Sequence, residues 1–387
     1  MSHKKTLHFF NELVEKHQIP KAYKKLSFKF NNKPFYKSSA NTSEKTVYPV
    51  ETYIAFPGFL TPKFNSDKFK AKCIEQKNQE CFGIILSPEI KTTQEYLVQN
   101  LSKNSRSPIL KKKKRLEACF NITYKVFFGN INKDEYDRLM DVAHAMLIKR
   151  FEQRNDSNFI LKNWNKYLEI LYPLINQNKA SFFVIYNENI PIQISINFHY
   201  DKTFFAYIPA YNIDYAQFGL GNTAVYKQLE WCIENKYEYL DMGNGDLEYK
   251  VRWCNHQYSL ETHIVYVKKN IVAQTKALIP IFKVKLINFL KSVKNLKKGN
   301  KKHNQSYKTK PPYKIETIEN NFKIQENEIQ EINFFDTHKE KYLSKIICDF
   351  IYSEKEHLNN IKIYNIVNTP NYIIKTPTKG INVSYKT

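Results

Sequence analysis

The sequence predicts an α/β chain built on a mixed sheet, and three observations lead to that class. Apolar residues occupy 42% of the 387 positions and aromatic residues 15%, which is typical of a folded core and not of a disordered chain. Residues 190–198 alternate apolar and polar side chains, which is the period of a β-strand. Residues 181–268 predict the order β-β-β-loop-α-β-α-β. Antiparallel strands followed by a βαβ crossover make a mixed sheet.

The elements before residue 155 are predicted from apolar periodicity. The predicted helices are residues 7–16 and 133–150, the latter capped by Asn132, and the predicted strands are residues 47–56, 81–86 and 118–128. Two polar stretches, residues 21–43 and 103–114, predict irregular segments, and the second contains Ser107-Pro108. We therefore expect residues 1–155 to form an α/β half of their own.

The second half has the clearer pattern. The predicted helices are residues 159–176, 222–236 and 246–254, and the predicted strands are residues 181–186, 190–198, 203–208, 239–242 and 262–267. A lysine-rich amphipathic helix and a basic linker follow over residues 270–312. Residues 313–387 predict a small, separate α/β extension without motifs. The domain boundaries expected from these patterns fall at residues 155/156, 269/270 and 312/313.

The net charge of +23 is unevenly distributed along the chain. Eleven lysines and no acidic residue lie between Lys283 and Lys314, and a second basic run spans Lys111 to Arg115. Clustered cations favour anionic partners such as phosphate-bearing cofactors, nucleic acid or a lipid surface. A solvated linker and a solvated loop are the alternative for these two runs.

The six cysteines show no CxxC or paired spacing, which predicts neither a disulfide framework nor a zinc knuckle and fits a reducing, cytoplasmic compartment. The amino terminus is too polar for a signal peptide. No run of about 20 apolar residues is present, so we expect a protein that is soluble or at most peripheral at a membrane. The sequence predicts no metal site.

Four of the nine glycines fall between residues 219 and 245. Gly219 and Gly221 directly precede a predicted helix, where backbone N–H groups and the positive end of the helix dipole form a cradle for a diphosphate. A simple turn with Asn222 as the helix cap is the alternative. Gly243 and Gly245 follow the strand that the helix would place parallel to residues 203–208. Ligands bind where parallel strands separate at their carboxyl ends.

The helix after the second glycine pair carries polar groups on one face. Asp246, Tyr249, Lys250 and Trp253 share that face by their i, i+3, i+4, i+7 spacing. An acid, a phenol and an amine after a glycine loop at a strand end favour catalysis over packing.

These stretches resemble one family. The segments IYNENIPIQISINF, GLGN before a helix, and YLDMGNGDLEYKVRW are similar to GNAT-type acyltransferases of the CelD-type, cellulose-biosynthesis-associated branch, which is related to the FemAB aminoacyltransferases. The last segment is similar to that family's pattern F-D-F-x-x-G-x-x-x-Y-K-x-x-W. The resemblance covers residues 160–268 well and residues 120–154 weakly, where these families carry a preceding half, here degenerate. Ala216 stands where the general GNAT loop has Gln or Arg.

The resemblance implies a bacterial enzyme that transfers an acyl group, from acetyl-CoA or another acyl-CoA, directly to an amine. The coenzyme A contacts that it implies are Phe218, Gly219, Leu220, Gly221, Asn222 and Lys250. The catalytic candidates are Tyr249 as the acid that protonates the thiolate, with Asp246, or alternatively Asp241, as the carboxylate for the acceptor amine. The substrate-binding candidates are His199, Asn244 and Arg252, and His199 either acts as a base or faces water.

Three functions remain open at this point. The first is an acyl-CoA-dependent N-acyltransferase acting on an envelope, sugar or lipid-linked amine. The second is a FemAB-like transferase that uses aminoacyl-tRNA, with tRNA as the less favoured donor. The third is a non-catalytic GNAT scaffold that binds membrane or nucleic acid through residues 270–312, which would place the protein at the inner membrane surface.

Overall fold

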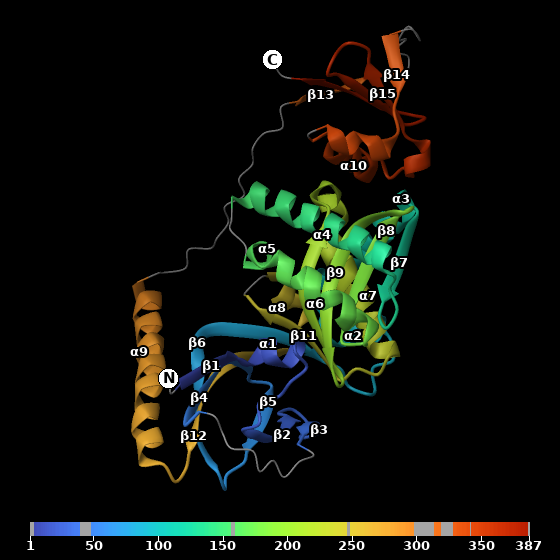
Figure 1. Cartoon of the computed structure of the whole chain (residues 1–387). Helices are drawn as coiled ribbons and strands as arrows, with labels where there is room; N and C mark the ends of the chain where they lie inside the picture. The colour runs from blue at the N-terminus through green and yellow to red at the C-terminus, as the bar shows by residue number, and fades with distance from the viewer. Residues whose placement is uncertain are drawn as a thin grey trace.

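The computed structural model describes residues 4–38, 48–155, 159–245, 248–297, 313–318, 328–340 and 342–385. Asp246 and most of the basic linker therefore lie outside the described residues. Figure 1 shows a large central sheet flanked by helices, with a smaller sheet at the carboxyl-terminal end of the chain. No helix in the described part of the chain combines the length and apolar character needed to cross a bilayer.

A nine-stranded mixed sheet forms the centre of the molecule, which confirms the predicted fold class. Its order is β1 (Lys4–His8), β4 (Val50–Pro57), β12 (His256–Val267), β6 (Phe69–Ile85), β11 (Tyr239–Asn244), β10 (Thr203–Tyr211), β9 (Ile190–Tyr200), β8 (Ala180–Asn187) and β7 (Ile122–Phe127). The pairs β1–β4 and β10–β11 are parallel. The long strand β6 pairs with both β11 and β12 and so joins the N-terminal half to the second half.

The prediction for residues 7–43 is wrong in two places. Residues 7–16 are not one helix, because Lys4–His8 forms β1 and only Phe9–Val14 forms helix α1. The stretch 21–43 also contains β2 (Tyr23–Phe28) and β3 (Pro34–Lys37), which pair in a three-stranded sheet with β5 (Leu60–Phe64). The strands concerned are short, and β1 and β2 also pair with strands further along the chain, so local periodicity did not reveal them.

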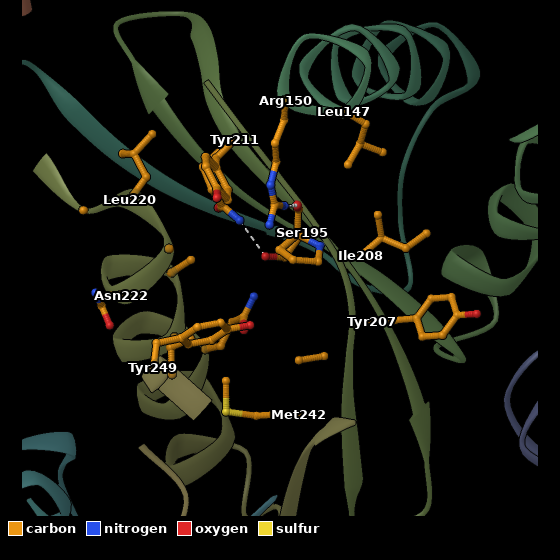
Figure 2. A pocket seen from close by; sticks show the side chains of 18 of the residues that line it. Leu147, Arg150, Ser195, Tyr207, Ile208, Tyr211, Leu220, Asn222, Met242 and Tyr249 are labelled. Carbon is orange, nitrogen blue, oxygen red and sulfur yellow. Dashed lines mark hydrogen bonds between the residues drawn. The ribbon is translucent and has the colours of Figure 1, made fainter. Parts of the chain in front are cut away.

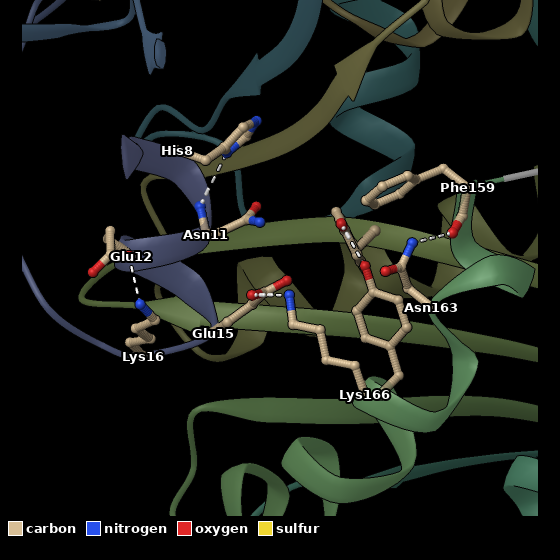
Figure 3. A network of polar contacts seen from close by, with 10 residues as sticks. His8, Asn11, Glu12, Glu15, Lys16, Phe159, Asn163 and Lys166 are labelled. Atoms are coloured by element: carbon tan, nitrogen blue, oxygen red, sulfur yellow. Dashed lines mark hydrogen bonds and ion pairs between the residues drawn. The ribbon is translucent and has the colours of Figure 1, made fainter. Parts of the chain in front are cut away.

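Polar contacts hold α1 against the helices of the second half (Figure 3). Lys166 of α6 (Trp164–Asn176) pairs with the nearly buried Glu15 at the end of α1, with 2.5 Å between Nζ and Oε2. His8 accepts a hydrogen bond from the backbone N–H of Asn11 and so caps α1. Asn163, which precedes α6, donates to the carbonyl of Phe159 in α5 (Phe159–Lys162). The chain start is thereby tied to the main sheet's helical layer.

Helices cover the two faces of the second half differently. On one face, α4 (Lys133–Arg154) and α6 bury their apolar stripes against Ile194, Ile196 and Phe198 of β9. On the other face, α2 (Thr93–Asn100), α7 (Leu220–Glu234) and α8 (Glu248–Trp253) share an apolar cluster with Phe204 and Leu240. The polar side chains of β9 consequently lie on the α7 side.

Residues 103–114 form a helix and not the expected loop. Helix α3 runs over Lys103–Cys119, with the Ser102 side chain accepting from the N–H of Ser105 as its cap. Ile109, Leu116 and Cys119 are buried on one side of it, so tertiary packing outweighs the helix-breaking tendency of Pro108.

The C-terminal region has its own five-stranded sheet but is not separate from the rest. Its strands are β13 (Tyr313–Ile318), β17 (Gly380–Tyr385), β16 (Tyr372–Lys375), β15 (Lys362–Ile366) and β14 (Ile329–Glu331). Helix α10 (Leu343–Glu354) shares an apolar cluster with α3 and with the short helix η1 (Ile213–Phe218). Arg115 of α3 also donates to the carbonyl of Tyr352 over 2.7 Å. The extension therefore has its own sheet and also packs against α3 and η1.

The parallel strands β10 and β11 separate after a short paired segment. Their register runs only from Thr203 with Tyr239 to Phe205 with Asp241. Beyond it, β10 continues with β9 through a bulge between Ala206 and Ile208, while β11 continues with β6. A bulge bends its strand, so it widens the opening between the two carboxyl ends.

Candidate active site

A cavity of about 590 Å³ occupies the opening between β10 and β11 (Figure 2). Helix α4 contributes one wall, the start of α7 a second, and the end of β11 with α8 a third. The labelled lining residues are Leu147, Arg150, Ser195, Tyr207, Ile208, Tyr211, Leu220, Asn222, Met242 and Tyr249. Gly219, Gly221, Asn244, Tyr249 and Lys250 thus meet at one site although they lie on separate elements.

The start of α7 forms the wall predicted as the phosphate cradle. Gly219 has a φ of +68° and is the N-cap, a left-handed conformation that glycine adopts without strain. The helix begins at Leu220, two residues earlier than expected, so Leu220 and Gly221 are its first residues. The N–H groups of Asn222 and Thr223 already donate to the Gly219 carbonyl, so the donors that a ligand can reach are those nearer the start of the helix. A Cβ on Gly221 would meet nothing within 4 Å, so the backbone there is open to a ligand.

Lys112 of α3 lies against this cradle. A Cβ on Gly219 would be 3.1 Å from Cδ of Lys112, so the lysine stem runs directly past the N-cap. The sequence predicts a loop over residues 103–114 and therefore does not predict this contact. The helical course of α3 brings one lysine of the run Lys111 to Arg115 to the start of α7. One lysine of the basic run therefore passes beside the N-cap of α7.

Two of the predicted cradle residues have structural contacts. Phe218 is fully buried and packs edge-on against the rings of Phe120 and Tyr352, and it is not among the cavity-lining residues. Asn222 does line the cavity, but its side-chain oxygen accepts a hydrogen bond from Nε1 of Trp253 over 2.9 Å. Asn222 thus connects α7 to α8.

Tyr249 and Arg150 extend toward one another from opposite sides of the cavity (Figure 2). Burial raises the pKa of the Tyr249 phenol to about 12, and the charge of Arg150 opposes this rise. Arg150 donates from Nη1 to the carbonyl of Pro209 over 2.9 Å, and its guanidinium lies 4.5 Å from the ring centre of Tyr211. Its buried Nε has no hydrogen-bond partner among the described residues. Arg150 was not predicted, since a lysine- and arginine-rich helix end offers no distinguishing signal.

Lys250 lies on α8 and is nearly buried beside the end of β11. Its Nζ donates to the carbonyl of Asn244 over 2.6 Å, and both residues line the cavity. Burial lowers the pKa of the Lys250 amine, and the charge of nearby Asp241 opposes that effect. The lysine therefore fixes the course of the glycine-containing loop as well as presenting a cation to the cavity.

Asp241 lies behind this loop and is absent from the cavity lining. Its Oδ1 accepts hydrogen bonds from the Tyr258 hydroxyl at 2.7 Å and from the backbone N–H of Gly243 at 3.1 Å. Burial raises the pKa of the Asp241 carboxyl to about 6. The placement suits a residue that shapes the Gly243 turn.

The polar side chains of β9 form the floor of the cavity. Gln193, Ser195 and Asn197 line it, and Gln193 donates to the Ser195 hydroxyl over 2.5 Å. The buried oxygens Oε1 of Gln193 and Oδ1 of Asn197 have no hydrogen-bond partner within the described ranges. A ligand that donates hydrogen bonds would satisfy them. The alternation of these residues with isoleucines was visible in the sequence, but nothing local showed that the polar face is enclosed.

His199 continues this row of side chains but lies away from the cavity lining. Its two ring nitrogens form hydrogen bonds of 2.8 Å with the Ser181 and Tyr237 hydroxyls. Burial lowers the pKa of His199 to about 3. The expectation that His199 faces water is wrong, because α7 and its flanking aromatic rings cover this end of the strand.

Arg252 is partly exposed on α8 and does not line the cavity. The structure brings Gly219, Leu220, Gly221, Asn222, Asn244, Tyr249 and Lys250 together around the cavity. It leaves Phe218, His199, Asp241 and Arg252 outside the lining.

A model of a known family matches this part of the chain. Residues 103–251 match the family described as Acetyltransferase (GNAT) domain. No curated protein sequence matches the chain. Residues 103–251, which include the described lining of the cavity, are therefore similar to a GNAT acetyltransferase domain, and this match supports an acyltransferase.

Solved structures give only distant likenesses. A conserved protein of unknown function from Bacteroides thetaiotaomicron is 9% identical over 56% of this chain and 70% of its own, with a TM-score of 0.38. A functionally unknown conserved protein from Staphylococcus epidermidis is 11% identical over 56% and 72%, with a TM-score of 0.32. FemX is 11% identical over 59% and 75%, with a TM-score of 0.31. These values are too low to support a functional argument.

Proposed function

We propose that the protein transfers an acyl group from a coenzyme A thioester, with acetyl-CoA as the favoured donor, to the amine of an envelope, sugar or lipid-linked acceptor. The observation that carries the proposal is the cavity between the separated ends of β10 and β11, with the open start of α7 on one wall and Tyr249 on another. The segment from Tyr239 to Trp253 supports a place in the CelD-type branch of the GNAT enzymes.

The donor's phosphates fit the start of α7. Anions bind at helix N-termini because unpaired N–H groups and the helix dipole both favour negative charge. Gly221 leaves that backbone uncovered, and Lys112 adds a cation beside Gly219. The acyl-bearing arm would then extend along β10, whose edge has no strand partner beyond Phe205 on the β11 side. Backbone N–H groups on such an edge are available to polarise a thioester carbonyl.

The chemical step is direct attack. The acceptor ammonium first loses a proton to a carboxylate, a role that we assign to Asp246. The amine nitrogen then bonds to the thioester carbonyl carbon, the carbon–sulfur bond breaks, and the thiolate receives a proton from Tyr249. The raised pKa of Tyr249 keeps its phenol protonated at neutral pH, as an acid requires. Asp241 serves as a support for the loop in this scheme, because its carboxylate already has two partners.

The acceptor side of the cavity is polar. Among the described residues Oε1 of Gln193, Oδ1 of Asn197 and Nε of Arg150 have no partner, so the two oxygens can accept hydrogen bonds from a ligand and the nitrogen can donate one. A ligand rich in hydroxyl and N–H groups, such as an amino sugar, would satisfy the two oxygens. An acidic group on the acceptor would satisfy the arginine.

Donor binding tests the proposal. Isothermal titration of the full chain with acetyl-CoA should give saturable binding, and native mass spectrometry should show one bound coenzyme A. Gly221→Val should abolish binding while the fold is retained, because a Cβ at this position meets no described atom within 4 Å and the side chain then fills the cradle. Lys112→Ala should weaken binding about ten-fold, more at low salt than at high salt.

Lys114→Ala is the matched control, since Lys114 is an exposed lysine on the same helix two residues away. Its affinity for acetyl-CoA should stay within about two-fold of the native value, as expected for an exposed charge. Undiminished binding by the Gly221→Val protein would refute the cradle. Tight binding of aminoacyl-tRNA without any binding of acetyl-CoA would instead support the FemAB-like donor.

A further inference from the structure

The helix that follows the main sheet is attached by a narrow stripe of small and polar residues. Helix α9 spans Ile271–Lys297 and packs on β12, β6 and β4 (Figure 1). Ala273 and Ala277 are buried against Val50 and Ile264. Further along, Asn288 donates to the carbonyl of Glu75 at 2.7 Å and accepts from the N–H of Lys77 at 3.1 Å. One side of the helix is therefore fixed to the protein.

The opposite side of α9 is apolar and bare. Successive residues of a helix are about 100° apart, which places a second set of side chains on an arc directly opposite Ala277. Phe282 is 68% exposed and Phe289 is 64% exposed, although both are large and apolar. The outward arc is formed by Leu278, Ile279, Phe282, Leu286, Phe289 and Leu290. Contiguous apolar exposure of this kind marks an interaction surface.

Cations flank this arc. The same helical spacing places Lys285 at one edge of the arc and Lys276 and Lys283 at the other. The sequence of α9 contains no aspartate or glutamate, and the basic residues continue into the linker after it. An apolar face with lysines at both of its edges, and with no acid, is the pattern of a helix that lies in a membrane interface.

We propose that α9 binds an anionic lipid surface, lying flat with its outward arc among the acyl chains and its lysines at the headgroups. The helix is about 40 Å long, so it provides an extended contact. A second copy of this chain fits less well, because a two-fold contact through the same face would bring the flanking lysines of the two copies together with no acid on α9 to offset them. The side of α9 that contacts the sheet lies opposite the outward arc, so the arc can bind lipid while the helix stays packed on the sheet.

Vesicle sedimentation with the full-length protein tests this. The protein should sediment with vesicles of equal parts phosphatidylglycerol and phosphatidylcholine at about 0.1 M salt, and at least about ten-fold less with phosphatidylcholine alone. Exchanging Phe282→Ser together with Phe289→Ser should weaken the binding at least about ten-fold. Lys283→Ala with Lys285→Ala should weaken it less and should reduce its dependence on salt.

Val98→Ser is the matched control, because Val98 is 52% exposed on α2, away from α9, and its loss should leave vesicle binding unchanged. In a second variant, Phe282→Trp, the added fluorescence should shift to shorter wavelength when vesicles are present. Equal sedimentation of native and double-serine proteins, or an unshifted emission from the Phe282→Trp protein, would overturn the proposal. So would a concentration-dependent dimer that the serine changes dissociate, without any vesicle binding.

Discussion

Nε1 of Trp253 donates a hydrogen bond to the side-chain oxygen of Asn222, and this 2.9 Å contact joins the two glycine-containing segments of the cavity. Asn222 lies in the first turn of α7, beside the cradle, and Trp253 ends α8, which carries Tyr249. Trp253 is fully buried, so its N–H depends on this acceptor. The position of the proposed acid is thereby coupled to that of the proposed phosphate site.

Asn222→Ala should lower the free energy of unfolding by about 1–3 kcal/mol, because it leaves the buried indole N–H without an acceptor. Asn222→Asp, which keeps an oxygen at this position, should cost less. Urea unfolding followed by circular dichroism measures both. Asn235→Ala is the control, since Asn235 makes an exposed contact to the Trp231 carbonyl at the far end of α7 and should change stability by less than about 0.5 kcal/mol. Equal effects at the two sites would contradict the coupling.

Tyr249→Phe should reduce kcat by about 10²-fold or more while the affinity for acetyl-CoA stays within about two-fold. The substitution removes the hydroxyl that protonates the thiolate and keeps the ring that packs beside Cys254 and Met242. Steady-state kinetics with a thiol-reactive reagent, together with titration of the donor, separates the two quantities. Tyr226→Phe provides the control, because Tyr226 lies on α7 outside the cavity lining and contacts Lys113. A fully active Tyr249→Phe enzyme would exclude the phenol as the acid.

Asp241 should make the stability of the native protein fall as pH rises from about 4 to about 6. Its pKa is about 6 in the folded chain, against about 4 in an unfolded one, so the unfolded state ionises first as pH rises. Between these two pH values the folded state retains a proton that the unfolded state has released. Above about pH 6 the carboxyl is ionised in the folded state as well, and the full free-energy cost of burying its charge applies. A shift of this size corresponds to about 3 kcal/mol.

Asp241→Asn should remove this dependence, because the amide has no charge to bury and still accepts from Tyr258. Urea unfolding of both proteins at several pH values between about 3.5 and 7.5, compared by subtraction, isolates the contribution of this one carboxyl. The variant should gain stability relative to the native protein as pH rises. If the difference in the free energy of unfolding between the two proteins stayed constant over this pH range, the pKa of Asp241 would be the same in the folded and unfolded states.

Local patterns were sufficient for the elements of the second half. The alternation in residues 190–198, the crossover helix and the glycine pairs correspond to β9, α7 and the loops around the cavity. They failed where an element depends on a distant partner. β1 exists because it pairs with β4, which lies far along the chain, and α3 persists through Pro108 because Ile109 and Leu116 are buried.

By itself, the sequence determined the mixed fold class, the positions of the glycine pairs and the polar face that contains Tyr249 and Lys250. Periodicity and backbone freedom are properties of neighbouring residues, so they can be read without a structure. Only the tertiary structure decided which polar groups share the cavity. It placed Lys112 beside Gly219 and Arg150 opposite Tyr249, and it enclosed His199 in the interior. These outcomes depend on how separate elements pack against one another. The sequence of a short segment does not show which distant segments will bury its side chains or pair with it in a sheet.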